Sequence, residues 1–194
     1  MIFKKNGKSH IVYTIGAPVL REDAAPVAVV DDSIRQLAFD MFEAMRFFNG
    51  IGLAAPQYGH SLRLVVIDVP PEGNTGSPGE ALLLPRMPLA LVNPEIVMSS
   101  GSCASRDEGC LSVPGVYAPV CRPERVVLRA QILDGEFIEI ECGGLLGRCI
   151  QHELDHLDGK LFTDRLTSEE ARKVRGDLDR LTRIGQTKNF RRNK

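Results

Sequence analysis

Hydrophobic positions recur with a helical period early in the chain. Between residues 34 and 48 the apolar side chains are spaced by three and four positions, at Ile34, Leu37, Ala38, Met41, Phe42, Met45 and Phe48. Ser33, with Gln36 three residues later, is expected to cap this helix, and Asn49-Gly50 is expected to end it. The single apolar stripe indicates a helix that faces a hydrophobic core.

Short runs rich in β-branched residues indicate strands in the middle of the chain. Residues 63–69 (RLVVIDV) form one run, and residues 89–97 (LALVNPEIV) form a second. Between them, residues 70–80 contain three Pro and three Gly, which predicts a mobile surface loop. Two later runs, residues 125–133 and 136–142, flank Asp134-Gly135, a strong signal for a hairpin with one buried face.

Helical patterns return in the last third of the chain. Residues 145–157 form a periodic apolar segment that follows Gly143-Gly144 and is ended by Asp158-Gly159. A further helix is expected from about Ser168 to Ile184-Gly185. Helices that flank strands and hairpins, without regular βαβ alternation, are typical of an α+β fold. We therefore expect a single domain over residues 1–194, with antiparallel strands and hairpins packed around the helix at 145–157, and with an N-terminal and a C-terminal helix.

Composition narrows the class of protein further. The 194 residues are 43% hydrophobic and 25% charged, which excludes a disordered or fibrous chain. A formal net charge of −1 provides no overall field for binding DNA or an anionic membrane. No stretch approaches the length of a membrane span, the N-terminus lacks the apolar region of a signal peptide, and five cysteines without CxxC spacing argue against a disulfide framework. We expect a cytoplasmic protein.

The segment QHELDH at residues 151–156 indicates metal chemistry. His152 and His156 lie one turn apart on the same helix face, so both imidazoles can reach one metal ion. Glu153 is displaced by about 100° around the helix and can contact a water at the metal without ligating the ion. Leu145 and Cys149 continue the histidine stripe and predict an apolar wall beside the site. This arrangement is typical of a metal-dependent hydrolase.

A catalytic site of this kind needs a third protein ligand, and the residues alone leave its identity open. The extended metzincin motif fails because Phe162 occupies its last histidine position. Glu169 or Glu170 would complete a peptidase site, whereas Cys149 and Cys110 are the two candidate thiolates. A closed structural site, in which a fourth protein ligand replaces the water, is the non-catalytic alternative.

Three separated segments together resemble the bacterial-type peptide deformylase family. They are GIGLAAPQ at residues 50–57, EGCLS at 108–112 and QHELDH at 151–156, and they occur in this order. The likeness extends over roughly residues 15–166. The resemblance implies a hydrolase that removes the N-formyl group from the N-terminal methionine of newly synthesised proteins and releases formate.

The resemblance also implies roles for individual residues. Cys110, His152 and His156 would bind one divalent metal, usually Fe²⁺ in this family, with Zn²⁺, Ni²⁺ or Co²⁺ also possible. Glu153 would act as general base and acid, while the Gln57 side chain and the Leu111 backbone N–H would form the oxyanion hole. The substrate contacts implied by the resemblance are Ile51, Gly52, Gly109, Leu145 and Cys149.

Positive charge gathers at the C-terminus. From Thr163 to Lys194 there are ten Lys plus Arg against five Asp plus Glu. We expect a solvated helix followed by a basic, flexible tail at about residues 186–194. For a deformylase, which meets its substrate at the ribosome, this segment suggests docking on ribosomal RNA.

Overall fold

A five-stranded antiparallel sheet forms the centre of the protein. The computed structural model describes residues 2–5, 8–72 and 75–190, with side chains described for 11–72 and 75–186. The strand order across the sheet is β3 (Gly52–Ala54), β4 (Leu64–Ile67), β5 (Leu89–Ser99), β8 (Arg125–Ile132) and β9 (Phe137–Gly143). The predicted strands are confirmed, and β8 and β9 pair as the expected hairpin around Asp134-Gly135.

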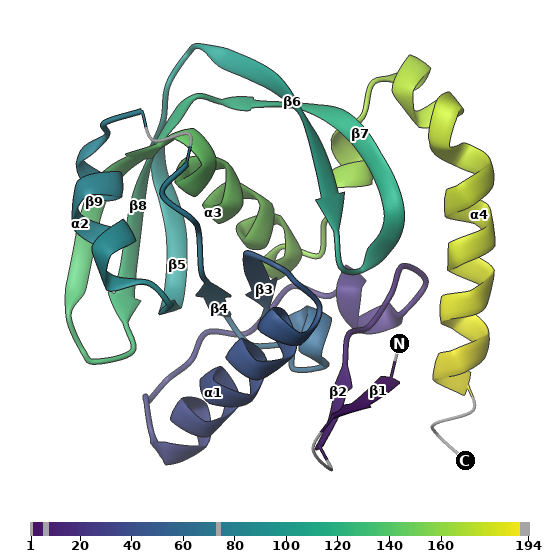
Figure 1. Ribbon diagram of the computed structural model, residues 1–194, viewed down its shortest axis with the longest axis horizontal. Coiled ribbons are helices and arrows are strands. Elements are labelled where there is room, and N and C mark those ends of the chain that lie inside the picture. The colour runs from purple at the N-terminus through teal and green to yellow at the C-terminus, as the bar shows by residue number, and fades with distance from the viewer. Residues whose placement is uncertain (1, 6–7, 73–74, 191–194) are drawn as a thin grey trace.

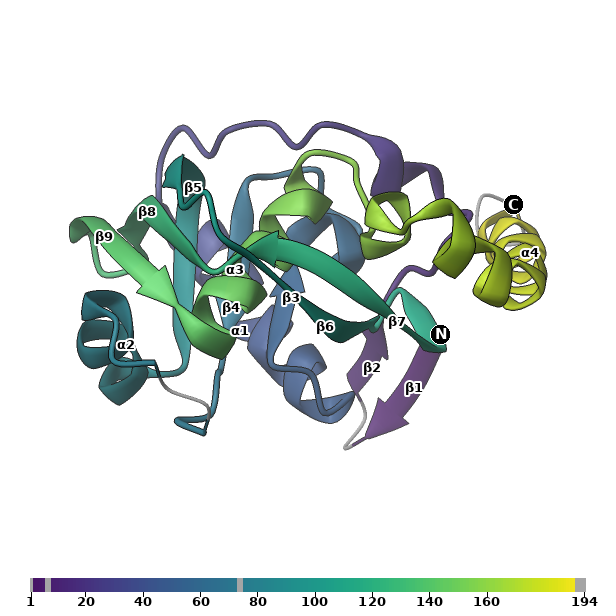
Figure 2. The ribbon, with the colours of Figure 1, turned by 90° about the horizontal axis from the view of Figure 1, so that it is seen from above.

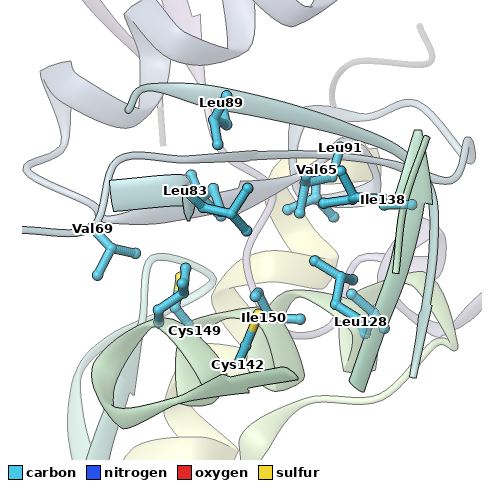
Figure 3. Close-up of a cluster of buried hydrophobic side chains, with 14 of the residues drawn as sticks. Val65, Val69, Leu83, Leu89, Leu91, Leu128, Ile138, Cys142, Cys149 and Ile150 are labelled. Carbon is cyan, nitrogen blue, oxygen red and sulfur yellow. The ribbon is translucent and has the colours of Figure 1, made fainter. Parts of the chain in front are cut away.

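Helices cover the two faces of this sheet. Strand β4 is buried throughout, and its side chains alternate between two hydrophobic clusters, since successive strand residues point to opposite faces. Leu64 and Val66 join the cluster that contains the buried side of α1 (Asp32–Phe47). Val65 joins Ile150 and Cys149 of α3 (Gly144–Leu157) in the other cluster, drawn in Figure 3. The sheet therefore separates α1 from the helix that carries the HExxH segment.

Two β-ribbons stand beside the central sheet. Strands β6 (Cys103–Cys110) and β7 (Val113–Pro123) form one, and β1 (Ile2–Lys5) and β2 (Lys8–Ile11) form the other. The β6–β7 ribbon passes α3 and packs Val116, Ala118 and Val120 into a third cluster with Leu181 of α4 (Ser168–Phe190). Helix α4 and the short helix α2 (Pro78–Leu83) lie at opposite ends of the molecule (Figures 1 and 2). The expected α+β class is confirmed.

The N-terminal end of α1 differs from the prediction. Asp31 is the N-cap in place of Ser33, because its Oδ1 accepts the backbone N–H groups of Ser33 and Ile34, each at 3.0 Å. A carboxylate two residues earlier thus satisfies the free N–H groups that open the helix. The other end is as expected, and Asn49 takes the left-handed conformation with φ 56°.

Part of the predicted mobile loop at residues 70–80 is a packed element. Ser77 and Glu80 form a reciprocal capping box at the start of α2, and both side chains are buried. The Ser77 hydroxyl also accepts the backbone N–H of Gly143 at 3.0 Å, directly before α3. The end of the loop is therefore fixed against the strand that leads into the HExxH helix.

Helix α4 continues beyond its predicted end at Ile184-Gly185 and reaches Phe190. Gly185 marks a close approach and not a stop, because a Cβ there would lie 2.1 Å from the carbonyl oxygen of Ile15. Gly16 faces the same contact, since its Cβ would lie 2.5 Å from the Thr182 carbonyl oxygen. Of the predicted flexible tail, residues 186–190 are helical and 191–194 lie outside the described residues. None of the helices in the described ranges could span a membrane.

These glycines give a direct test of how α4 is attached. Gly185→Ala is expected to lower the free energy of unfolding by about 1–3 kcal/mol, because the added methyl group overlaps backbone atoms. Gly176→Ala, in the same helix, meets no atom within 4 Å and should raise it by about 0.5–1 kcal/mol. Urea unfolding followed by circular dichroism measures both, and equal effects would contradict the close packing.

Candidate active site

Helix α3 places the two histidines in the interior. Leu146, Ile150 and Leu157 pack on the sheet, which fixes the rotation of the helix about its axis. His152 and His156 then project from the opposite side, with ring centroids 5.1 Å apart. His156 is only 1% exposed. The predicted face shared by the two imidazoles is confirmed.

The β6–β7 ribbon brings Cys110 to the histidines. A shift in strand register between Gly109 and Cys110, where Cys110 pairs with Val113, re-aims the thiol at the end of β6. Cys110 Sγ lies 3.2 Å from His156 Nε2. Cys149 lies apart from this group, with its Sγ 3.7 Å from the Ile51 carbonyl oxygen. The structure therefore selects Cys110 over Cys149 as the third candidate ligand.

These three residues form a metal site. One ligand atom each from Cys110, His152 and His156 lies within 4.8 Å of the other two. A thiolate with two imidazoles suits a divalent transition metal, and three protein ligands leave a position for water. Among the described residues, no fourth His, Cys, Asp or Glu joins the group, which disfavours a closed structural site.

Glu108 orients His152. The His152 Nδ1–H donates to Glu108 Oε2 at 2.9 Å, which leaves Nε2 as the nitrogen available for the metal. Burial by itself would raise the pKa of Glu108, but hydrogen bonds from Arg122 and His152 outweigh it and lower the pKa to about 2. Glu108 is thus a permanent anion that holds the ring of His152.

Arg122 links the ribbon to α3 through buried charge. Its Nε–H and Nη2–H groups donate to Glu108 at 2.6 and 2.8 Å, and its Nη1–H donates to Asp155 at 2.8 Å. Arg165 also donates to Asp155, and Arg148 donates to Glu108 at 2.7 Å. Arg122 is 1% exposed, so its pairs with Glu108 and Asp155 are shielded from water. The network fixes the two elements that carry the metal ligands.

The amide of Gln57 has a fixed orientation. Its Oε1 accepts the Ala54 backbone N–H at 2.8 Å, which turns Nε2 toward the metal site. Nε2 donates to Ser112 Oγ at 3.2 Å and lies 3.4 Å from Cys110 Sγ. The side chain is 1% exposed. Gln57 therefore presents N–H donors beside Cys110. Leu111, whose backbone N–H is the other predicted oxyanion donor, is the next residue in the chain after Cys110.

Glu153 is buried without full compensation. Its Oε2 has no hydrogen-bond partner, and burial, as the largest cause, raises its pKa to about 7. Gly52 permits this close packing, because a Cβ there would lie 2.3 Å from Glu153 Oε1 and 2.9 Å from Cys149 Sγ. A carboxyl group with this pKa can accept and return a proton near neutral pH.

A cavity of about 570 Å³ opens above the metal site. Of the eleven residues assigned to the site from the sequence, ten line this cavity, and the eleventh, His156, is buried and does not. The substrate-contact candidates among the lining residues are Ile51, Gly52, Gly109, Leu145 and Cys149. The exposed ring of Tyr117 also lines the cavity.

The alternative carboxylate ligands have other partners. Glu169 pairs with Lys173 on the exposed side of α4. Glu170 accepts the Thr167 N–H at 3.0 Å and its hydroxyl at 2.7 Å, as a helix-capping residue does. Neither belongs to the metal-ligand group, and the peptidase interpretation is therefore wrong.

Sequence reasoning missed the supporting residues of the site. Ser112 accepts from Gln57, Arg122 and Arg148 hold Glu108, and Asp155 pairs with Arg122, yet none of the four was singled out. Asp155 and Ser112 lie inside the quoted motifs, so their positions offered a signal. For Arg122 the only sequence signal is its place among apolar residues in PVCRP (residues 119–123), and this signal is weak.

The comparison with protein families agrees with this geometry. The polypeptide deformylase family model matches residues 9–172, which is most of the chain. The chain belongs to the peptide deformylase family. Family members are metal-dependent hydrolases that remove the N-formyl group from nascent polypeptides, and that is the activity of this deformylase.

Individual relatives agree as well. The chain is 48% identical over 169 residues to a peptide deformylase of Alkalilimnicola ehrlichii, with 87% of this chain and 88% of the relative covered. It is 47% identical over 155 residues to a peptide deformylase of Dictyoglomus thermophilum, with coverages of 80% and 91%. A crystal structure of a peptide deformylase from Legionella pneumophila superposes with a TM-score of 0.75 at 40% identity, covering 90% of this chain and 96% of that one.

Removing Arg122 should destabilise this deformylase strongly. Arg122→Met leaves Glu108 and Asp155 as buried charges without their shared partner, which is expected to cost about 3–5 kcal/mol of unfolding free energy. Arg129→Met is the matched control, because Arg129 also bridges two carboxylates but at the surface, where water screens the charges, and it should lower the unfolding free energy far less. Chemical denaturation compares the two variants, and similar losses would contradict the role given to the buried network.

The low pKa of Glu108 predicts sensitivity to acid. Because its folded-state pKa of about 2 is below its ordinary value of 4.5, ionised Glu108 favours the folded state. This contribution is complete above about pH 4.5 and is lost as the pH falls toward about 2. Unfolding free energies of metal-free protein across that window should fall less steeply for Glu108→Gln than for wild type. The exposed control Glu139→Gln should keep the wild-type slope, and an unchanged slope in Glu108→Gln would refute the assignment.

Proposed function

We propose that this deformylase cleaves the formamide of N-formylmethionine with one metal ion, one proton carrier and two oxyanion donors. A single observation carries the proposal. Cys110, His152 and His156 converge on one point, and Cys110 and His152 line one cavity together with Glu153 and Gln57. Each group the reaction needs is therefore within reach of one bound carbonyl group.

Cys110, His152 and His156 would hold the metal, and we propose Fe²⁺ as the native ion. When bound, such an ion supplies Lewis acidity and a water that is nucleophilic at neutral pH. The same ligands suit Zn²⁺, Ni²⁺ and Co²⁺, so supply and oxygen would decide which ion is present in the cell. Glu108 would keep the ligating nitrogen of His152 in place through the bond to Nδ1.

Glu153 would move the proton. Its buried carboxylate accepts a proton as water attacks the formyl carbon and then delivers that proton to the nitrogen of the leaving amine. Two features support this role: the unpartnered Oε2 and the pKa raised to about 7 by burial. An ordinary surface carboxylate would be a much weaker base at neutral pH.

Gln57 and Leu111 would stabilise the negative charge on the formyl oxygen. The Ala54 N–H holds Gln57 Oε1, so the Nε2 donors need no reorientation during the reaction. The Leu111 backbone N–H would be the second donor, next to Cys110. One such donor is typically worth about 3–4 kcal/mol of transition-state stabilisation.

The substrate would bind as an added strand. Strand β3 lies at the edge of the central sheet, and Ile51 precedes it at the cavity wall. A peptide laid along Ile51 and Gly52, with Gly109 facing it from the ribbon, would gain backbone hydrogen bonds. Its methionine side chain would rest against Leu145 and Cys149, which form an apolar wall.

Formate release tests the proposed chemistry. Anaerobically purified, metal-loaded protein should release formate from formyl-Met-Ala-Ser, and Glu153→Gln should be slower by roughly 10²–10⁴-fold with its metal content unchanged, because a positioned proton carrier contributes that much. Glu169→Gln, which alters an exposed carboxylate, should keep wild-type activity.

Two outcomes would overturn the assignment. Fully metal-loaded wild type that releases no formate would contradict the deformylase reaction. Full activity in Glu153→Gln would leave the reaction standing and would remove Glu153 from the role of proton carrier.

We also infer that the basic C-terminal segment docks on ribosomal RNA. Arg172, Arg175, Arg180 and Arg183 are exposed along α4, and four further Lys or Arg residues follow Gln186. Such a row of cations suits a phosphate backbone. One side of α4 packs on the ribbon, and the exposed side that carries these arginines is accessible to a large particle.

Co-sedimentation with ribosomes tests this inference. A chain ending at Gln186 should bind ribosomes roughly tenfold more weakly than the full chain at low salt. Added salt should reduce this difference, because the full chain makes more phosphate contacts and therefore loses more affinity as salt screens them. Arg125→Gln, which removes an exposed cation from strand β8 of the central sheet, should bind as wild type does. Equal binding of the truncated and full chains would exclude the tail as the docking element.

We place the protein in the cytoplasm. All five cysteines are free thiols, which fits a reducing compartment. A deformylase that acts on new polypeptides would also work where translation occurs.

A further inference from the structure

Two cysteines that have no part in the deformylase site lie close together on the outer face of the β6–β7 ribbon. Cys103 opens β6 and Cys121 lies near the end of β7, and both are exposed and free. In the ribbon register, Cys121 is opposite Ser105 and Cys103 is opposite Pro123. Alternate strand residues share a face, so the two thiols are diagonal neighbours on one face.

The two thiols lie on one face of the ribbon and within interaction range of each other across this diagonal. Desolvation, followed by charge repulsion and a side-chain hydrogen bond with Cys121, raises the pKa of Cys103. The register and this mutual influence both place the two thiols side by side on the ribbon. The strong twist of a two-stranded ribbon brings some diagonal pairs together in this way.

We propose that Cys103 and Cys121 form a dithiol site that closes to an intramolecular disulfide when it meets a small-molecule disulfide. One cysteine thiolate attacks a sulfur of the small disulfide, which forms a mixed disulfide and releases one small thiol. The thiolate of the second cysteine then attacks the protein sulfur of the mixed disulfide and expels the other small thiol. The two cysteines lose two protons and two electrons, and the small disulfide gains them as two thiols.

The surrounding structure favours closure of this pair over other outcomes. Arg148 donates to the carbonyl oxygens of Ala104 at 2.6 Å and Val120 at 3.0 Å, each directly beside one of the cysteines. The two strands are therefore held together at this point by a side chain in addition to the ladder. The two cysteines are thereby kept on neighbouring strands at a fixed spacing.

The remaining cysteines are poorly placed to compete. Cys142 is fully buried, and burial raises its pKa to about 12. Cys149 is also buried, and burial raises its pKa well above the ordinary value. Cys110 is engaged with His156 in the metal site. Within the described residues, no three-ligand group includes Cys103 or Cys121, which favours thiol exchange over metal binding.

Peptide mapping after exposure to a defined disulfide tests the proposal. Zn²⁺-loaded protein is incubated with oxidised glutathione, free thiols are blocked with N-ethylmaleimide, and the protein is digested with trypsin and chymotrypsin without reductant. Cleavage after Arg106, Leu111, Tyr117 and Arg125 puts Cys103, Cys110 and Cys121 on separate peptides. The expected product is a linked pair of the Cys103 and Cys121 peptides, lighter by two hydrogens and released by dithiothreitol.

Matched variants separate proximity from simple exposure. In Cys103→Ser and in Cys121→Ser, the remaining thiol should carry one glutathione. The double variant Cys121→Ser with Pro119→Cys keeps two thiols on the outer face but moves one next to Asp107, two residues farther from Cys103. It should give no linked pair. A wild-type protein that carries glutathione on both cysteines, or that links only between molecules, would overturn the proposal.

Discussion

The guanidinium group of Arg122 lies where the β6–β7 ribbon crosses helix α3, and two carboxylates from these two elements share its donors. Glu108 belongs to the ribbon and also holds the ring of His152, while Asp155 belongs to the helix and directly precedes His156. The mutual position of the thiol and the two imidazoles therefore depends on one set of buried charges. Burying these groups is tolerated because each one is paired, and loss of any single member would leave another buried charge without its partner.

The protein interior shifts the pKa values of Glu108 and Glu153 in opposite directions. Glu108 accepts hydrogen bonds from arginines and a histidine, and its pKa falls to about 2. Glu153 packs against Gly52 and has one carboxylate oxygen without a hydrogen-bond partner, and burial raises its pKa to about 7. Two carboxyl groups in one buried region are thus divided into a fixed anion and a proton carrier. Environment alone makes this division, since the side chains are chemically identical.

Local patterns predicted the parts of the fold that depend on local physics. Helical and strand periodicity located α1, α3 and the β8–β9 hairpin, and the HExxH spacing placed two imidazoles on one face. Choosing Cys110 over Cys149 required either the family resemblance or the structure, because a ribbon fold brings Cys110 across from another part of the chain. Gly185 looked like a helix stop because sequence cannot distinguish a glycine that ends a helix from one that admits a neighbouring carbonyl. Arg122 was missed for a similar reason, since its partners are distant in sequence.

The contacts of Gly16 and Gly185 have a consequence for any partner that grips α4. A helix joined to its domain by side chains alone can pivot, whereas backbone-to-backbone packing at two glycines leaves little room for rotation. The axis of α4 is then set with respect to the ribbon and the cavity. A partner surface that binds this helix therefore determines both the distance of the cavity mouth from that surface and the direction in which the cavity opens.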